Sequence, residues 1–286
     1  MIKIKRASCP KVLKGSRPKG THYNKKKVVE TLWKMQHEKC CYCEQKVPKK
    51  GHLKAVEHFY PKSVYKNRRN DWKNLLLACA QCNGQKSDRF PTELTDNSGE
   101  AKVLYQKRNS RGQSLIIDPS DTDVDPEDHI DFVVDDAEDD YGIPMEKCHS
   151  ALGRTTIKTI GLDGEFYTKE RRYFHTKILC GAYLLLLEAR DGDDQEMWKT
   201  ARYRFAMLLS ANGRFAAYAR AFARHKRVNE KFGIRIPVGA ELAGDVLGAD
   251  CLARGRLHSL GPHVEVPLAQ YRLQAGVEDG RMMFTI

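Results

Sequence analysis

Hydrophobic positions recur at helical spacing near the start of the chain and again through its second half. Between residues 25 and 39 the apolar side chains fall about one helical turn apart, which predicts an amphipathic helix: Val28, Val29, Leu32, Trp33 and Met35. After Ile143-Pro144 we expect a largely helical region. It comprises a packing element at 151–162 and helices at 164–190, 193–210 and 214–231, the last with a strongly basic face.

Short apolar runs separated by polar stretches dominate residues 40–90. Ala55–Glu57 and Leu75–Leu77 predict two short strands, and a short helix is predicted from Cys82 onward, giving ββα order. A unit with so few apolar residues is not stable alone, so we expect a structural metal to supply the missing stability. A further strand is predicted at Ser114–Ile117. We therefore expect an α+β protein.

The distribution of charge separates three regions. Residues 1–90 hold 23 Lys or Arg against 6 Asp or Glu, whereas residues 118–140 hold twelve acids and no Lys or Arg. We predict a basic N-terminal region with the ββα unit at 1–95, an acidic connection at 96–145 and a mainly helical region at 146–286. A basic first third attracts polyanions in a salt-dependent way, although a solvated surface has the same composition. The acidic stretch is interpreted as a solvated loop or a docking surface.

No segment has the composition of a membrane span. The longest strongly apolar run, Ile178–Leu187, has ten residues, about half of the ~20 needed to cross a bilayer. The basic N-terminus has no apolar core behind it, so no signal peptide is predicted. Nine cysteines, four of them at metal-ligand spacing, favour a reducing compartment over a disulfide framework. We therefore expect a cytoplasmic protein without membrane contact.

Two C-x-x-C pairs bracket the ββα unit. One C-x-x-C turn brings two thiolates to the same ion, so Cys40, Cys43, Cys79 and Cys82 supply the four ligands of a structural Zn²⁺. Cys41 is a spare thiol in the first pair, and a Cys41/Cys43 pairing stays open. His37 and His52 lie near enough in sequence to replace a cysteine.

The residues between the cysteine pairs suit phosphodiester hydrolysis. Neutral His58 has the side chain whose ordinary pKa best suits proton abstraction near pH 7. Adjacent side chains on a strand point to opposite faces, so the Glu57-His58 pair implies a bend at the end of the strand. Glu57 and Asn83 offer oxygen ligands to a hard ion such as Mg²⁺. Asn74 is placed to hold the loop that bears His58.

Basic residues near these groups are candidates for binding the nucleic-acid backbone. Lys62, Arg68 and Arg69 lie in the loop between the two predicted strands. Lys86 lies three residues after Asn83, on the same helical face, from which we expect it to meet a phosphate.

The order of these motifs resembles the HNH endonuclease superfamily, whose core is a ββα-metal unit. The segments that carry the resemblance are CCYCE at 40–44, VEHFYPKS at 56–63, WKNLLLAC at 72–79, and CN at 82–83 with FP at 90–91. More narrowly, the chain is similar to the HNH nuclease subunit of Septu-type anti-phage systems, which is also found in some retrons. The similarity spans roughly residues 1–175 and is most specific at 40–91.

The resemblance implies a role for each motif residue. His58 would be the general base, Glu57 and Asn83 would bind the catalytic Mg²⁺ or Mn²⁺, and Asn74 would brace the loop. The four cysteines would form the structural zinc site. Many HNH enzymes have Asp at the position of Glu57 and His at that of Asn83, and these departures leave the preferred catalytic metal open. The resemblance also implies a partner, an ABC/SMC-like ATPase.

These observations predict an HNH endonuclease that cleaves nucleic acid, with DNA as the first expectation, as the effector of an anti-phage complex. Two alternatives stay open. One is an RNA-directed nuclease, for example one that acts on tRNA. The other is a non-catalytic zinc adaptor that brings nucleic acid to the complex.

Overall fold

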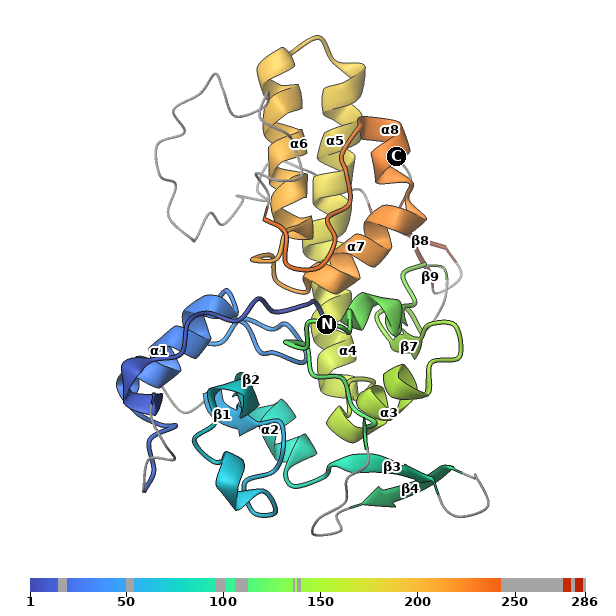
Figure 1. Cartoon of the computed structure of the whole chain (residues 1–286). Coiled ribbons are helices and arrows are strands. Elements are labelled where there is room, and N and C mark those ends of the chain that lie inside the picture. The colour runs from blue at the N-terminus through green and yellow to red at the C-terminus, as the bar shows by residue number, and fades with distance from the viewer. Residues whose placement is uncertain are drawn as a thin grey trace. The chain divides into compact units, whose positions relative to one another are not determined.

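The computed structural model describes residues 1–14, 20–49, 54–95, 101–105, 113–135, 137, 140–242, 275–278 and 281–284 (Figure 1). The chain divides into two compact units, Met1–Cys251 and Leu252–Ile286. The second unit contains an antiparallel hairpin of β8 (Ala275–Glu278) and β9 (Arg281–Phe284). The features below belong to the first unit.

The predicted N-terminal helix is α1 (Lys26–Met35), which buries Val28 and Leu32 and follows a short 3-10 turn at Lys11–Leu13. It ends earlier than expected because His37 and Glu38 take left-handed φ angles of 52° and 65°. These residues turn the chain into the first cysteine pair.

The predicted ββα unit is present. β1 (Lys54–His58) pairs antiparallel with β2 (Leu75–Cys79), with Lys54 opposite Cys79 and His58 opposite Leu75. α2 (Ala80–Lys86) follows β2 directly and begins two residues before Cys82. Two 3-10 turns shape the loop between the strands, η2 (Lys66–Arg68) and η3 (Trp72–Asn74). β2 is buried from Leu75 to Ala78, so this small sheet is anchored by an apolar strand.

Small sheets make up the connection to the helical region. β3 (Pro91–Thr95) lies between β4 (Ala101–Tyr105) and β5 (Gln113–Ser114), and β6 (Ile130–Phe132) pairs with β7 (Pro144–Glu146) after the 3-10 turn η4 (Pro126–Asp128). The strand predicted at Ser114–Ile117 pairs only at its start. Ile116 and Ile117 leave the strand and are buried instead.

The second half of the unit is helical, as predicted. α3 (Ala151–Ile160) is capped by Ser150 and ends at left-handed Gly161. α4 (Glu165–Phe174), a π-helical turn at His175–Leu179 and α5 (Cys180–Asp191) follow in one run, and α5 lies beside α6 (Gln195–Leu209). The helix predicted at 214–231 is two helices, α7 (Ala216–His225) and α8 (Val228–Phe232), because Arg227 takes a φ of 54°.

Within the described parts of the chain, every helix is too short or too polar to cross a membrane.

Two main hydrophobic cores hold the unit together. The first joins residues of α1, β2, the connection, α3 and α4, among them Leu32, Leu76, Ile117, Ile160 and Tyr167. The second lies among the later helices. The first core thus crosses both predicted boundaries, at 95 and at 145, and the division into 1–95, 96–145 and 146–286 stays a prediction. The α+β class is confirmed.

Two arginines on the basic face of α7 are paired with acidic residues. Arg220 is buried and forms an ion pair with Glu127, and Arg224 pairs with Asp131. The acidic connection therefore supplies counter-charges to α7. Arg171 of α4 also points inward, where its guanidinium donates to the backbone oxygens of Gly142 and Leu162.

Candidate active site and metal centre

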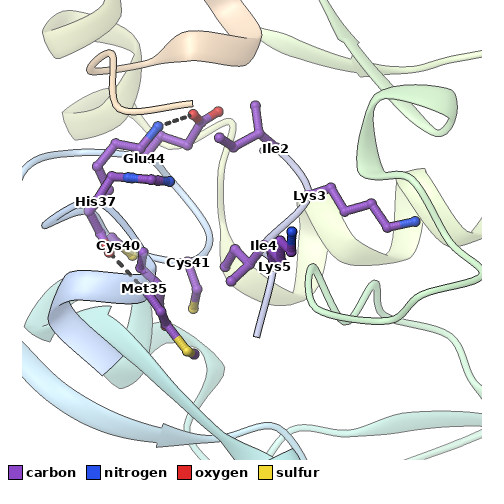
Figure 2. A pocket seen from close by; sticks show the side chains of 11 residues that line it. Ile2, Lys3, Ile4, Lys5, Met35, His37, Cys40, Cys41 and Glu44 are labelled. Carbon is purple, nitrogen blue, oxygen red and sulfur yellow. Dashed lines mark hydrogen bonds and ion pairs between the residues drawn. The ribbon is translucent and has the colours of Figure 1, made fainter. Parts of the chain in front are cut away.

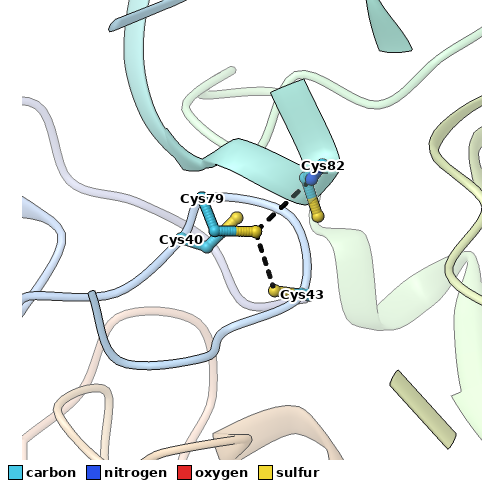
Figure 3. Close-up of side chains that lie close together, drawn as sticks. All are labelled: Cys40, Cys43, Cys79 and Cys82. Atoms are coloured by element: carbon cyan, nitrogen blue, oxygen red, sulfur yellow. Dashed lines mark hydrogen bonds between the residues drawn. The ribbon is translucent and has the colours of Figure 1, made fainter. Parts of the chain in front are cut away.

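The four predicted zinc ligands lie together. The sulfurs of Cys40, Cys43, Cys79 and Cys82 are all within 4.8 Å of one another (Figure 3). With a Zn–S bond of about 2.3 Å, a tetrahedral site separates its sulfurs by about 3.8 Å. The Cys43 and Cys79 sulfurs are 3.8 Å apart. The cluster therefore has the donor set and the spacing for a Zn²⁺ ion.

The described residues bear on two of the alternative ligands, Cys41 and His37. Cys41 and His37 line a small cavity beside residues 2–5 and do not belong to the cluster (Figure 2). His52 lies outside the described residues. Every cysteine that the structure describes is unbridged, and Cys40 and Cys43 are the two residues of the first pair whose sulfurs join the cluster.

Groups from α4 surround the cluster. The Tyr167 hydroxyl lies 3.1 Å from the Cys82 sulfur, within hydrogen-bond distance, and it would be the donor to a metal-bound thiolate. Burial lowers the pKa of Arg171 to about 10, although the negative charges of Cys43 and other groups oppose this shift. Four thiolates with one Zn²⁺ would carry two net negative charges, which the buried guanidinium of Arg171 and the hydroxyl of Tyr167 would stabilise.

The first cysteine turn is fastened to the start of α7. The Lys39 ammonium nitrogen lies 2.9 Å from Glu44 Oε2 and 2.8 Å from the Gly213 oxygen. Burial would raise the pKa of Glu44, but Lys39 and the N-terminal ammonium outweigh it and lower the pKa to about 2. Glu44 also accepts a hydrogen bond from the amide of Ala217. The metal centre and the helical region thus share one polar network.

His58 is the last residue of β1 and is held as a neutral base. It is 6% exposed, and the chain bends at Phe59 and Tyr60, which confirms the bend expected after the Glu57-His58 pair. Its Nε2 lies 2.9 Å from the Arg69 carbonyl oxygen. A carbonyl only accepts, so Nε2 carries the hydrogen and Nδ1 keeps the lone pair. Burial lowers the pKa of His58 to about 4, with nearby cations contributing.

Glu57 and Lys86 form a buried ion pair. The Lys86 ammonium nitrogen lies 2.7 Å from Glu57 Oε1 and 3.0 Å from the His58 carbonyl oxygen. Tyr42 also donates to Glu57 Oε1, at 3.2 Å. Burial raises the pKa of Glu57 despite the opposing effects of Lys86 and Tyr42.

This geometry contradicts the prediction that Lys86 contacts a phosphate. Its side chain has no exposed surface, and its charge is used to balance Glu57. The carboxylate of Glu57 is buried in β1 and needs a cation within the protein. Lys86 on α2 supplies that cation, so it does not face the substrate.

Asn83 lies on α2, next to the zinc ligand Cys82, and is half-buried. Among the described residues its side-chain amide makes no hydrogen bond. The Glu57–Lys86 contact holds α2 against β1, so a carboxylate and an amide come from two packed elements. This oxygen donor set suits Mg²⁺ or Mn²⁺, which commonly keeps water and phosphate oxygens as its remaining ligands.

Asn74 fixes the loop between β1 and β2. Its Oδ1 accepts from the Tyr60 amide at 2.7 Å, and its Nδ2 donates to the oxygens of Tyr60 at 3.0 Å and Arg68 at 3.1 Å. Because the next carbonyl, that of Arg69, holds the imidazole of His58, these bonds help to define the orientation of the base.

The predicted nucleic-acid-binding residues of the loop lie beside His58. Lys62 and Arg69 are exposed, and the Arg68 guanidinium packs 3.9 Å from the centroid of the Tyr60 ring. The sequence interpretation missed Tyr23, whose ring meets that of His58 edge-on at 4.6 Å. Tyr23 belongs to a turn-rich segment without hydrophobic period, so no local signal linked it to a histidine 35 positions later.

Comparison with known proteins agrees with these features. Residues 40–89 match the family model of the HNH endonuclease. Septu protein PtuB of Bacillus thuringiensis is 35% identical over 95 residues, which cover 30% of this chain and 37% of that protein. Septu protein PtuA of Bacillus mycoides is 26% identical over 164 residues, 52% of this chain and 21% of that protein.

The chain thus spans little more than a third of the length of one of these relatives and about a fifth of the other. The family match begins at the first zinc ligand and includes both cysteine pairs, His58 and α2. Together with the observed ββα order, it identifies residues 40–89 as an HNH endonuclease domain.

Proposed function

We propose that this chain is a metal-dependent endonuclease that hydrolyses phosphodiester bonds of nucleic acid, with DNA as its main substrate. The observation that carries the proposal is the state of His58. The Arg69 carbonyl fixes its tautomer, and burial keeps it neutral. A neutral imidazole with its lone pair on Nδ1 is the form that removes a proton from water.

The chain's own groups divide the work of hydrolysis. His58 accepts a proton from the attacking water through Nδ1, while its Nε2–H stays bonded to the Arg69 oxygen. Asn74 keeps the loop in place during this transfer. Lys62, Arg68 and Arg69 bind and orient the phosphate backbone by charge.

We infer two metals with different tasks. The four cysteines, which come from the first cysteine turn, β2 and α2, would hold Zn²⁺ as a structural ion. Glu57 and Asn83 would hold Mg²⁺ or Mn²⁺. That ion supplies positive charge against the negative charge that builds on the phosphate and the leaving oxygen. Glu57 would have to share its carboxylate between this ion and Lys86.

The biological setting follows from the relatives. Both carry the name Septu, one as PtuB and the other as PtuA. We infer that this nuclease acts in the cytoplasm as the effector of an anti-phage defence complex, together with an ABC/SMC-like ATPase subunit.

A cleavage assay with Mg²⁺ or Mn²⁺ tests the proposal on duplex DNA, single-stranded DNA, tRNA and unstructured RNA. His58→Ala should lose cleavage of every substrate while keeping zinc content and melting temperature. His225→Ala is a matched control because His225 is an exposed histidine at the end of α7. Equal cleavage by wild type and His58→Ala would contradict the assignment of the base. Cleavage of RNA alone would replace DNA as the substrate, and binding without any cleavage would favour the adaptor.

A further inference from the structure

The segment before α1 is fastened to the loop that carries the active-site contacts. Asn70 Oδ1 accepts from the backbone amides of His22 at 3.0 Å and Tyr23 at 3.2 Å, and Asn70 Nδ2 donates to the Gly20 oxygen at 2.9 Å. Asn70 directly follows Arg69, whose carbonyl holds His58. The loop therefore places residues 20–23 beside the general base, although they are distant in sequence.

The side chain of Tyr23 brings two cations together at this place. The Lys62 ammonium donates to the Tyr23 hydroxyl at 3.1 Å and lies 4.9 Å from the ring centroid. The Arg69 guanidinium carbon lies 5.6 Å from the same centroid. Burial would raise the pKa of Tyr23, but Lys62 and Arg69 outweigh it and lower the pKa.

Lys62 and Arg69 would not approach each other without a stabilising group, because two exposed cations repel each other and long side chains lose entropy when they are held. Within the described residues, neither Lys62 nor Arg69 forms an ion pair with a carboxylate. The shared group is the phenol of Tyr23, which offers an acceptor oxygen and an electron-rich ring face to both. Arg68, by contrast, is held separately on Tyr60.

We propose that Tyr23 gathers Lys62 and Arg69 into one phosphate-binding site at the edge of His58, which takes a backbone phosphate of the nucleic acid next to the bond that is cleaved. The inference rests on the proposed nuclease function, whose substrate it locates. A phosphate oxygen accepts from the ammonium and the guanidinium, and the phenol holds the ammonium in place.

The test measures binding separately from cleavage. In a His58→Ala background, the dissociation constants of short fluorescent DNA and RNA strands are measured by anisotropy over a series of salt concentrations. Tyr23→Phe, Lys62→Ala and their combination are compared. Lys66→Ala is the control for a loop lysine, since Lys66 is exposed and has no contact with Tyr23 among the described residues. Tyr173→Phe is the control for an exposed tyrosine on α4.

Tyr23→Phe should weaken binding about fivefold and Lys62→Ala about tenfold, by the usual strengths of neutral and charged hydrogen bonds. The double variant should bind no more weakly than about tenfold, because Tyr23 acts by placing Lys62. Lys62→Ala should also reduce the salt slope by about one. The two controls should stay within about twofold.

Binding by Tyr23→Phe equal to that of Tyr173→Phe, or effects that multiply in the double variant, would overturn the inference. Cleavage by the protein with His58 intact is scored in a separate assay. If that protein cleaves while Tyr23 and Lys62 act independently, only the phosphate site fails. If it does not cleave while the coupling is present, the phosphate site stands and the nuclease proposal fails.

Discussion

The Lys86 ammonium nitrogen lies 2.7 Å from Glu57 Oε1, and the two side chains are 0% and 3% exposed. This pair connects β1 to α2, and the same ammonium donates to the carbonyl oxygen of His58, the proposed general base. Lys86 therefore lies in the interior of the domain and not on its surface. There its charge balances a buried carboxylate and is not available to bind nucleic acid.

Lys86→Met should therefore act on stability. It leaves Glu57 buried without its cation, and removal of one partner of a buried pair costs about 3–5 kcal/mol. Urea unfolding of the zinc-loaded protein measures this loss. Adding Glu57→Gln to Lys86→Met removes the unpaired charge and should restore part of the stability. A stable Lys86→Met protein that is defective only in nucleic-acid binding would contradict the assignment.

Cys79→Ser should reduce zinc content and lower the melting temperature, because it removes one thiolate from the four-sulfur cluster. Metal analysis of the purified protein and a thermal melt check this outcome. Cys41→Ser is the control, since Cys41 is more deeply buried than Cys79 but lies outside the cluster. Equal zinc content in the two variants would show that the cluster is not the zinc site.

Substitution of Asn74 should lower stability, whereas substitution of Asn83 should weaken metal binding. Asn74→Ala removes three hydrogen bonds to the loop backbone and leaves buried groups unsatisfied, at about 1–3 kcal/mol each. Asn83→Ala removes no hydrogen bond within the described protein, so its melting temperature should change little. Its cleavage should instead require a higher Mg²⁺ or Mn²⁺ concentration. Titration of the divalent ion together with thermal melts distinguishes the two effects.

Cleavage should persist at lower pH than an ordinary histidine would allow. His58 is active as a base when neutral, and its pKa is lowered to about 4 from an ordinary value of 6.5. The fraction of neutral imidazole therefore falls only as the pH drops through about 4. A profile of kcat/KM against pH, with zinc content measured at each point, should be nearly flat between pH 7 and about pH 5. A limb centred on pH 6.5 would contradict this prediction.

The same shift affects folding stability. Between pH 6.5 and about 4 the unfolded chain binds a proton at His58 that the folded protein does not bind. Acidification through this window therefore reduces the free energy of unfolding. His58→Ala should lose this dependence, which unfolding at several pH values can measure.

Local pattern predicted the elements of the domain because each has a strong signal. Each signal spans only a few residues: the C-x-x-C spacing, the apolar run of Leu75–Leu77 and the Glu57-His58 pair. Lys86 shows the limit of such patterns. Its place on the helix was predicted, but which side of the helix packs against β1 depends on tertiary structure. Tyr23 and Asn70 became part of the site only through contacts between distant segments.

Charge composition was least informative about which charged side chains are exposed and which are buried. The basic residues of the α7 region were visible in sequence, but Arg220 is buried against Glu127 of the acidic connection. The break at Arg227, which divides the expected helix into α7 and α8, depends on a left-handed backbone conformation that no glycine or proline marks. Such features follow from packing among distant segments and not from local propensity.

The polar network from Lys39 and Glu44 to Gly213 and Ala217, together with the Tyr167–Cys82 contact, has an evolutionary consequence. A segment can be transplanted between genes intact only if its stabilising contacts travel with it. The residues that support this metal centre extend more than 120 positions beyond the end of the family match at 89. The unit that must be transplanted together is therefore much larger than the sequence signature at 40–89, and exchange of the helical half alone should destabilise the cysteine cluster even where it leaves every motif residue untouched.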